Sequence, residues 1–224
     1  MSRSHLFTIA KLFFLFDIWG MSLKTKVKVG NITSLSDARY CAGMGVLWLG
    51  FPVKSEDGSI LTPEKFMDIT GWVSGPEFVL EAHDTDLQDL YKTIGDYPAD
   101  YIEIDAAQLE FFDPAFIKSL IVSIDIHYWE KWRNKIIQSK ALISYLLIRN
   151  DREGNPMDLQ ALISEMADYC PVLLGFGVVK ESLNSILELP IAGIALKGSA
   201  EEKPGMKEYN QLADILEELD TEVI

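Results

Sequence analysis

The stretch that decides the fold is KVKVGNITSLSDARYCAGMGVLWLGF, residues 26–51. Residues 27–32 have the composition of a short strand, and the run 33–37, rich in hydroxyl and acidic side chains, is typical of a helix start. Gly43 and Gly45 mark the end of that helix. Residues 46–51 are almost wholly apolar, as in a parallel strand buried on both faces. The stretch therefore predicts a strand, a helix and a second strand.

The same alternation continues to the end of the chain. Apolar, β-rich runs are predicted as strands at 77–82, 100–105, 119–126, 141–148, 171–177 and 191–198, with helical stretches between them. No linker rich in Pro, Gly or Ser divides these units, and alternating strands and helices predict a parallel sheet. An open doubly wound sheet usually carries a glycine-rich fingerprint after its first strand, and GNIT is not one. The sequence thus favours a single-domain (β/α)8 TIM barrel over residues 23–224.

Residues 1–22 are expected to be an N-terminal extension to this barrel. Their apolar run is interrupted by Lys11 and has no cleavage site, so it does not fit a signal peptide, and it is too short to span a membrane. Met21 begins a segment that leads straight into the first strand. Two interpretations remain open: a misassigned start upstream of Met21, or an amphipathic helix that packs on the barrel.

Composition narrows the function. The 224 residues carry a net charge of −14, which argues against binding to nucleic acid or to an anionic membrane surface. The two cysteines, Cys41 and Cys170, have no CxxC spacing and suit a reducing cytoplasm. The three histidines have no metal-binding spacing, so we expect neither a metal nor a cofactor.

Two predicted strand ends have the features of a phosphate site. In a barrel of this class the site lies where the strands end, and phosphate usually binds at the loops after strands seven and eight. Those loops contain small or basic residues whose main-chain amides and side chains suit an anion. One glycine pair alone would indicate only a turn of the chain, but two neighbouring loops favour a site. The predicted phosphate-binding residues are Gly175, Gly177, Lys197, Gly198 and Ser199.

The chain resembles the phosphoribosylanthranilate isomerase family of tryptophan biosynthesis. KVKVGNITSLSDARYCAGMGVLWLGF is similar to that family's Lys-Val-Cys-Gly-Ile-Thr, Ser-x-x-Asp-Ala and Leu-Gly-Phe segments, and LTPEKF to its Ser-Pro-Glu helix start. PVLLGFGV and ALKGSAEEKPGMKEYNQLADILEEL are similar to its two phosphate-loop segments and its terminal helix. The resemblance runs from residue 26 to the end. It implies a barrel that performs the Amadori isomerisation of a phosphoribosylated anthranilate.

The resemblance also implies that the proton carriers of the family are absent. Its general base, a cysteine at the end of strand one, corresponds to Gly30, and its general acid, an aspartate at the end of strand six, corresponds to Ile148. The loop PVKSEDGSIL lacks the arginine that helps to hold the family's substrate. Positioned proton transfer contributes about 10²–10⁴-fold for each group. We therefore expect the isomerase activity to be lost or changed.

Other ionisable residues near predicted strand ends are candidate substitutes. One hypothesis is an active isomerase with Asp151 as acid and Asp105 or His83 as base. For any one carboxylate, a solvated or salt-bridged role is the commoner one. Glu81, Glu103 and Asp125 add to the acidic residues there and predict an anionic mouth, which would disfavour a substrate carboxylate.

Three interpretations follow. The first is a phosphoribosylanthranilate isomerase-like barrel, monomer or homodimer, that binds a small phosphorylated ligand without the family's acid and base. The second is the active isomerase with relocated groups. The third is a non-catalytic interaction protein.

Overall fold

The structure is a computed structural model. It describes residues 22–55, 58–83, 85–92, 94–113, 115, 119–152, 158–198, 201–203, 206–207 and 210–221. The extension expected at 1–22 lies, apart from its last residue, outside the described residues, as does Ser199.

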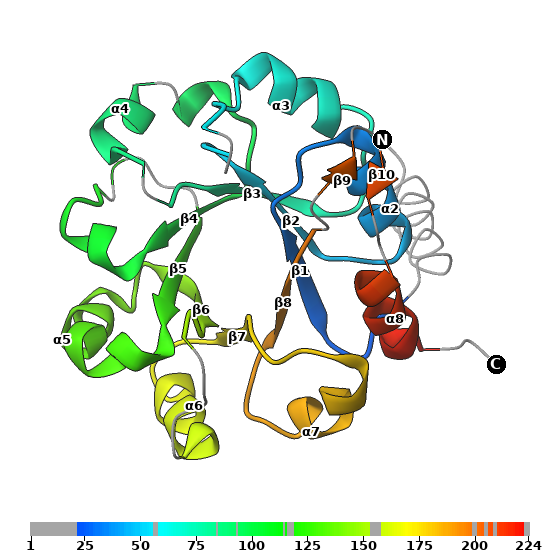
Figure 1. Ribbon diagram of the computed structural model, residues 1–224. Coiled ribbons are helices and arrows are strands. Elements are labelled where there is room, and N and C mark those ends of the chain that lie inside the picture. Colours follow the sequence, from blue (N-terminus) through cyan, green and yellow to red (C-terminus); the bar gives the residue numbers. More distant parts are fainter. Residues whose placement is uncertain are drawn as a thin grey trace, which may run out of the picture.

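Eight parallel strands close into a barrel in the order in which they occur along the chain (Figure 1). Strand β1 pairs with β2 on one side and with β8 on the other, which closes the ring. This ring confirms the predicted (β/α)8 barrel and rules out the open doubly wound sheet. The strands are β1 (Lys26–Gly30), β2 (Trp48–Pro52), β3 (Glu77–Glu81), β4 (Tyr101–Asp105), β5 (Ser119–Asp125), β6 (Ile143–Arg149), β7 (Val172–Leu174) and β8 (Gly193–Lys197).

Helices surround the barrel on its outside (Figure 1). The α-helices are α2 (Leu35–Gly43), α3 (Pro63–Thr70), α4 (Leu87–Tyr91), α5 (Trp129–Ser139), α6 (Leu159–Ala167), α7 (Leu183–Leu187) and α8 (Asn210–Leu219). Short 3-10 helices are η1 (Ile94–Asp96), η2 (Ala106–Glu110), η4 (Ile126–Tyr128) and η5 (Lys180–Ser182). After β8 the chain forms a small antiparallel pair, β9 (Glu201–Lys203) and β10 (Met206–Lys207), which the sequence pattern does not indicate.

Local sequence explains where these elements begin and end. Ser34 Oγ accepts a hydrogen bond from the Asp37 amide at 3.3 Å and caps α2, and Thr62 Oγ1 caps α3 in the same way. The strand predicted at 171–177 is shorter than expected and ends at Leu174. Gly177 has a φ of +66°, which turns the chain out of the strand direction.

The interior of the barrel is closed at one end. Its centre is filled by apolar side chains from six strands. One of them is Trp48, whose ring lies 4.8 Å from that of Tyr145 and 6.2 Å from that of Tyr101. Lys26 Nζ lies 3.3 Å from the Tyr145 hydroxyl at this end. The barrel interior therefore opens at the carboxyl ends of the strands, as in other barrels of this class. Among the described residues, no helix combines the length and apolar character needed to cross a bilayer.

Candidate functional site

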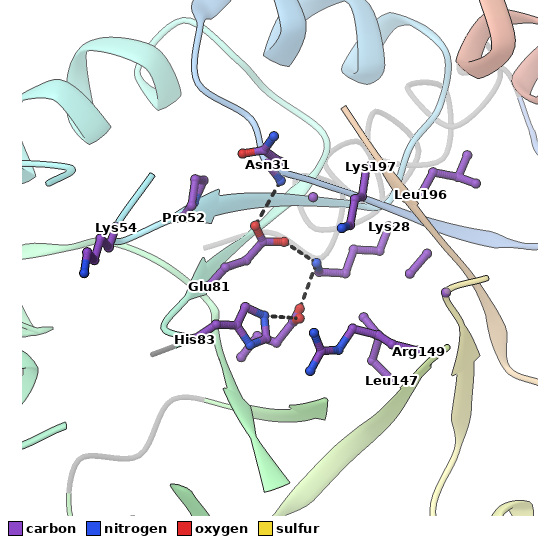
Figure 2. Close-up of a pocket in the computed structure, with 14 residues that line it drawn as sticks. Lys28, Asn31, Pro52, Lys54, Glu81, His83, Leu147, Arg149, Leu196 and Lys197 are labelled. Carbon is purple, nitrogen blue, oxygen red and sulfur yellow. Dashed lines mark hydrogen bonds and ion pairs between the residues drawn. The ribbon is translucent and has the colours of Figure 1, made fainter. Parts of the chain in front are cut away.

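A cavity of about 250 Å³ opens at the carboxyl end of the barrel. Strands β1, β3, β4, β6 and β8 each direct polar side chains towards it (Figure 2). Its lining residues are Lys28, Gly30, Asn31, Pro52, Lys54, Glu81, His83, Glu103, Leu147, Arg149, Gly175, Ala195, Leu196 and Lys197.

Lys28 is the centre of a buried ion-pair cluster in this cavity (Figure 2). Its side chain is 3% exposed, and Nζ lies 2.5 Å from Glu81 Oε1 and 2.7 Å from Glu103 Oε2. The two carboxylates come from β3 and β4, whose residues 81 and 103 are paired in register. A buried charge is tolerated only when it is paired, so each member of the cluster depends on the others.

The cluster continues as a chain of ion pairs towards the rim. His83 Nε2 lies 2.8 Å from Glu103 Oε1, and His83 Nδ1 lies 3.2 Å from Asp105 Oδ1. Arg149 Nη2 is 2.8 Å from the same Asp105 oxygen, and its Nη1 is 3.5 Å from Asp151 Oδ2. Charges therefore alternate in sign from Glu81 to Asp151, and we call this series the ion-pair chain.

The neighbours in the ion-pair chain fix its charge states. Burial alone would lower the pKa of Lys28 and raise that of Glu103, but their attraction outweighs burial. The pKa of Lys28 is raised, and that of Glu103 falls to about 2. For His83, burial is likewise outweighed by the contacts with Asp105 and Glu103, which raise its pKa to about 10. The imidazole is therefore a cation at neutral pH.

These shifts predict a pH dependence of stability. A raised histidine pKa stabilises the fold fully below the ordinary value of 6.5, and this contribution is lost as pH rises from 6.5 towards 10. The lowered pKa of Glu103 stabilises the fold above its ordinary value of 4.5, and that contribution is lost towards pH 2. We expect the free energy of unfolding contributed by these two groups to be greatest between pH 4.5 and 6.5.

Urea unfolding at a series of pH values measures the pH dependence of the free energy of unfolding. His83→Gln should flatten the decline between pH 6.5 and 10. His127→Gln is the control, because that imidazole is exposed, contacts Asn150 and lies outside the ion-pair chain. An equal slope in wild type and His83→Gln would contradict the assignment.

The charge of the mouth differs from the sequence-based expectation. Among the described residues, four basic side chains (Lys28, Lys54, Arg149 and Lys197) and two carboxylates line the cavity, in addition to the cationic His83. Lys28 pairs with both Glu81 and Glu103, and the ion-pair chain as a whole holds four carboxylates and three cations, so Lys54 and Lys197 leave the mouth with one positive charge in excess. The expectation of an anionic mouth is therefore wrong: in a chain of net charge −14, the cavity carries an excess of positive charge.

The space beside Gly30 is filled by a carboxylate. A Cβ atom built on Gly30 would lie 2.3 Å from Glu81 Oε1 and 3.2 Å from Lys28 Nζ. Gly50 on the neighbouring strand is in the same situation, with Glu81 Oε1 at 2.1 Å from its Cβ position. Glu81 thus occupies the volume that side chains at 30 and 50 would need.

The structure places the predicted acid position and the candidate substitutes as follows. Ile148 is fully buried in the core between strands and helices, whereas its neighbours Leu147 and Arg149 line the cavity. Asp105 and His83 are brought together, but as partners in the ion-pair chain. The Asp151 side chain is 51% exposed and lies beside a neighbouring cavity, away from Gly30.

Of the predicted phosphate-binding residues, Gly175 and Lys197 line the cavity. The amides of Gly175 and Gly198 donate to the carbonyls of Ile148 and Gly30, at 2.9 and 2.7 Å, so the barrel itself uses them. In the described chain, the amides of residues 176–178, which include Gly177, have no acceptor. No group of three His, Cys, Asp or Glu side chains suited to a metal occurs within the described ranges.

Lys28 and Arg149 are site residues that the sequence-based prediction does not contain. Side chains alternate along a strand, so residues 26, 28 and 30 of KVKVG all face the barrel interior. A lysine at 28, between valines that face the helices, is the sequence feature that indicates a charged side chain inside the barrel. The partners of Lys28, which lie 53 and 75 positions further along the chain, become its neighbours only when the barrel closes.

Comparison with known proteins agrees with this architecture. No protein-family model matches the chain, and no curated protein does either. Solved structures do match, each covering 87% of this chain and 98% of its own: the phosphoribosylanthranilate isomerase of Thermus thermophilus (20% identity, TM-score 0.65), monomers generated from the dimeric enzyme of Thermotoga maritima (15%, 0.66), and a phosphoribosylanthranilate isomerase in complex with reduced 1-(o-carboxyphenylamino)-1-deoxyribulose 5-phosphate (14%, 0.65).

At these identities, the likeness establishes a shared fold over almost the whole of the compared enzymes. The chain has the (β/α)8 barrel fold of the phosphoribosylanthranilate isomerases.

Proposed function

We propose that this chain is a diverged relative of the phosphoribosylanthranilate isomerases that binds a small phosphorylated ligand in the barrel mouth. The observation that carries the proposal is the positive lining of the cavity in a strongly acidic protein. A charge distribution of this kind attracts anions to one place and repels them elsewhere. The compared enzyme in complex with a deoxyribulose 5-phosphate derivative supports the choice of a sugar phosphate.

The phosphate would bind where β7 and β8 end. Lys197 is exposed at the end of β8 and lines the cavity, and it offers an ammonium group without a carboxylate partner in the described structure. The amides of residues 176–178, around Gly177, have no acceptor in the described chain and add donors in the loop after β7. Gly175, which lines the cavity, Gly198 and Ser199 complete the proposed loops.

The positions of the family's general base and general acid hold residues without an ionisable side chain in this chain. Neither Gly30 nor Ile148 can carry a proton, and Ile148 faces away from the cavity. The alternative base candidates, Asp105 and His83, neutralise each other in the ion-pair chain. We therefore propose that isomerisation of phosphoribosylanthranilate is absent or replaced by another reaction.

The proposal places the protein in the cytoplasm, as a monomer or homodimer, without a cofactor. Both cysteines are buried and neither forms a disulfide bond, which suits a reducing compartment.

The test is a thermal-shift titration with inorganic phosphate and with ribose 5-phosphate. At a ligand concentration tenfold above Kd, binding to the folded state should raise Tm by about 3–5 °C. Lys197→Ala should remove most of this shift. Lys140→Ala is the matched control, because that lysine is exposed at the opposite end of the barrel, and it should keep the shift.

The same preparations are assayed for turnover of phosphoribosylanthranilate. The proposal expects none above background. No thermal shift at millimolar phosphate, or an equal shift in Lys197→Ala, would leave the interaction-protein interpretation standing. Turnover within about tenfold of an active family member would favour the relocated acid–base pair.

A further inference from the structure

Two glycines leave room for the carboxylate of Glu81 at the wall of the cavity. Cβ atoms at Gly30 and Gly50 would lie 2.3 and 2.1 Å from Glu81 Oε1, distances that no side chain can adopt without moving it. Neither glycine has a positive φ, so backbone conformation does not require glycine at either position. Glycine is required there because a side chain would occupy the space of the Glu81 carboxylate.

Both oxygens of this carboxylate are held in place. Oε1 accepts from Lys28 Nζ at 2.5 Å, and Oε2 accepts from the Asn31 amide at 2.9 Å (Figure 2). Asn31 has a φ of +58° and is the one non-glycine residue in the described chain with a positive φ. This conformation, which asparagine tolerates better than most residues, turns its amide towards Glu81. A carboxylate has about four lone-pair sites, so these two bonds leave it able to accept a proton.

Lys28 places a positive charge next to the same point. Its Nζ is 3.2 Å from the Cβ position of Gly30, and Glu81 Oε1 is 2.3 Å from the same position. An ammonium has three donor hydrogens; one is donated to Glu81 Oε1, while Glu103 Oε2 lies 2.7 Å away as an ion-pair partner. Since Lys28 lines the cavity, a donor hydrogen remains for a ligand oxygen. The carboxylates of Glu103 and Glu81 outweigh the effect of burial and raise the pKa of Lys28, so the lysine stays charged.

From this arrangement we infer that Glu81 and Lys28 form a proton-transfer pair acting on a phosphorylated sugar that has a carbonyl group next to a C–H bond. Glu81 removes the proton from that carbon. The C–H electron pair forms a carbon–carbon double bond, and the carbonyl π electrons move to its oxygen, where Lys28 stabilises the negative charge. If the proton on Glu81 is replaced by a solvent proton before it returns to the same carbon, the result is exchange with solvent. If that carbon also carries a hydroxyl group, isomerisation follows when the hydroxyl proton passes to the former carbonyl oxygen and Glu81 returns its proton to the former carbonyl carbon, so that the carbonyl group moves to the first carbon. The inference rests on the proposed function, because the phosphate group anchors the sugar.

The inference is tested by deuterium exchange. Wild-type protein is incubated in D2O with D-ribulose 5-phosphate and with dihydroxyacetone phosphate, and deuterium at the carbon next to the carbonyl is followed by NMR. Wild type should incorporate deuterium above the buffer rate with at least one of the two. Glu81→Gln should lower that rate about 10²–10⁴-fold and keep the thermal shift with inorganic phosphate.

Glu77→Gln is the matched control. It removes a carboxylate from the same strand, four positions earlier, which accepts from Trp48 Nε1 at 2.9 Å at the closed end of the barrel. Its exchange rate should equal that of wild type. Glu81→Asp keeps the charge opposite Lys28 but withdraws the carboxylate by one methylene. It decides the test if the glutamine variant does not fold, and it should lower the rate at least tenfold.

The outcomes separate the two proposals. If phosphate raises the Tm of wild type but wild type shows no deuterium exchange, the proton-transfer pair is overturned and the binding function stands. An undiminished rate in Glu81→Gln, or in Glu81→Asp where only that variant folds, overturns it as well. Absence of both exchange and thermal shift overturns the binding function and, with it, the inference.

Discussion

Lys28→Met will destabilise the barrel by about 3–5 kcal/mol, the range observed when one partner of a buried ion pair is removed. Methionine fills a similar volume, so the loss is one of charge and not of packing. Glu81 and Glu103 both contact the ammonium, at 2.5 and 2.7 Å, and both are nearly inaccessible to water. Without Lys28 the two carboxylates would repel each other in a buried site. Urea unfolding at pH 7 measures the loss of free energy.

Three comparisons sharpen this prediction. Lys26→Met is the matched control, since Lys26 lies on the same strand two positions away and pairs with the Tyr145 hydroxyl instead of a carboxylate; its cost should stay below about 1 kcal/mol. The cost of Lys28→Met should shrink as pH falls below about 4.5, because protonated carboxylates no longer repel. The triple variant Lys28→Met, Glu81→Gln, Glu103→Gln should recover part of the loss. A cost under 1 kcal/mol for Lys28→Met would show that the cluster does not contribute as its geometry suggests.

The fold could be predicted because its signals are local. Each strand is a short apolar run, each of the first helices begins at a hydroxyl cap such as Ser34 or Thr62, and eight such units in one uninterrupted chain leave few architectures. Where the prediction missed an element, as at β9 and β10, the residues 201–207 carry no periodic pattern that distinguishes a hairpin from a loop.

The candidate site was only partly predictable, because its interactions join distant strands. Gly30 was identified as a position without a reactive group, but the sequence does not show that Glu81, on another strand, fills the space beside it. In the sequence, the strand-end carboxylates predict negative charge at the mouth. The pairing of Glu81 and Glu103 with Lys28 depends on which side of β1 faces inward and on the register between β3 and β4.

Ile148 illustrates the same limit at the level of a single residue. Alignment by resemblance assigned the family's acid position to it, yet alternation along β6 directs it to the helices, while Arg149, one position later, faces the cavity. The neighbouring position thus presents a permanent cation, which contributes to the positive lining. A shift of one residue along a strand exchanges the two faces, and resemblance at low identity does not resolve it.

Gly50→Ala is expected to destabilise the fold by about 2–4 kcal/mol, because a methyl group there forces Glu81 away from Lys28. The new Cβ would lie 2.1 Å from Glu81 Oε1 and 3.0 Å from the Gly30 Cα, so neither the carboxylate nor the adjacent strand can stay in place. Urea unfolding gives the cost. Deuterium exchange should fall together with stability, since the proposed base has been displaced.

Gly43→Ala is the control for this substitution, because a Cβ there meets no atom within 4 Å, and it should leave stability unchanged or raise it by up to about 1 kcal/mol, since Gly43 is the last residue of α2. The decisive measurement is a double-mutant cycle. With Glu81 already replaced by alanine, the methyl group at 50 has room, so the cost of Gly50→Ala should shrink by more than about 1 kcal/mol. An equal cost in both backgrounds would mean that the collision lies elsewhere. Glycine at 50 would then be explained by the close approach of β1 alone, and the pairing of two empty glycine positions with one carboxylate would lose its physical basis.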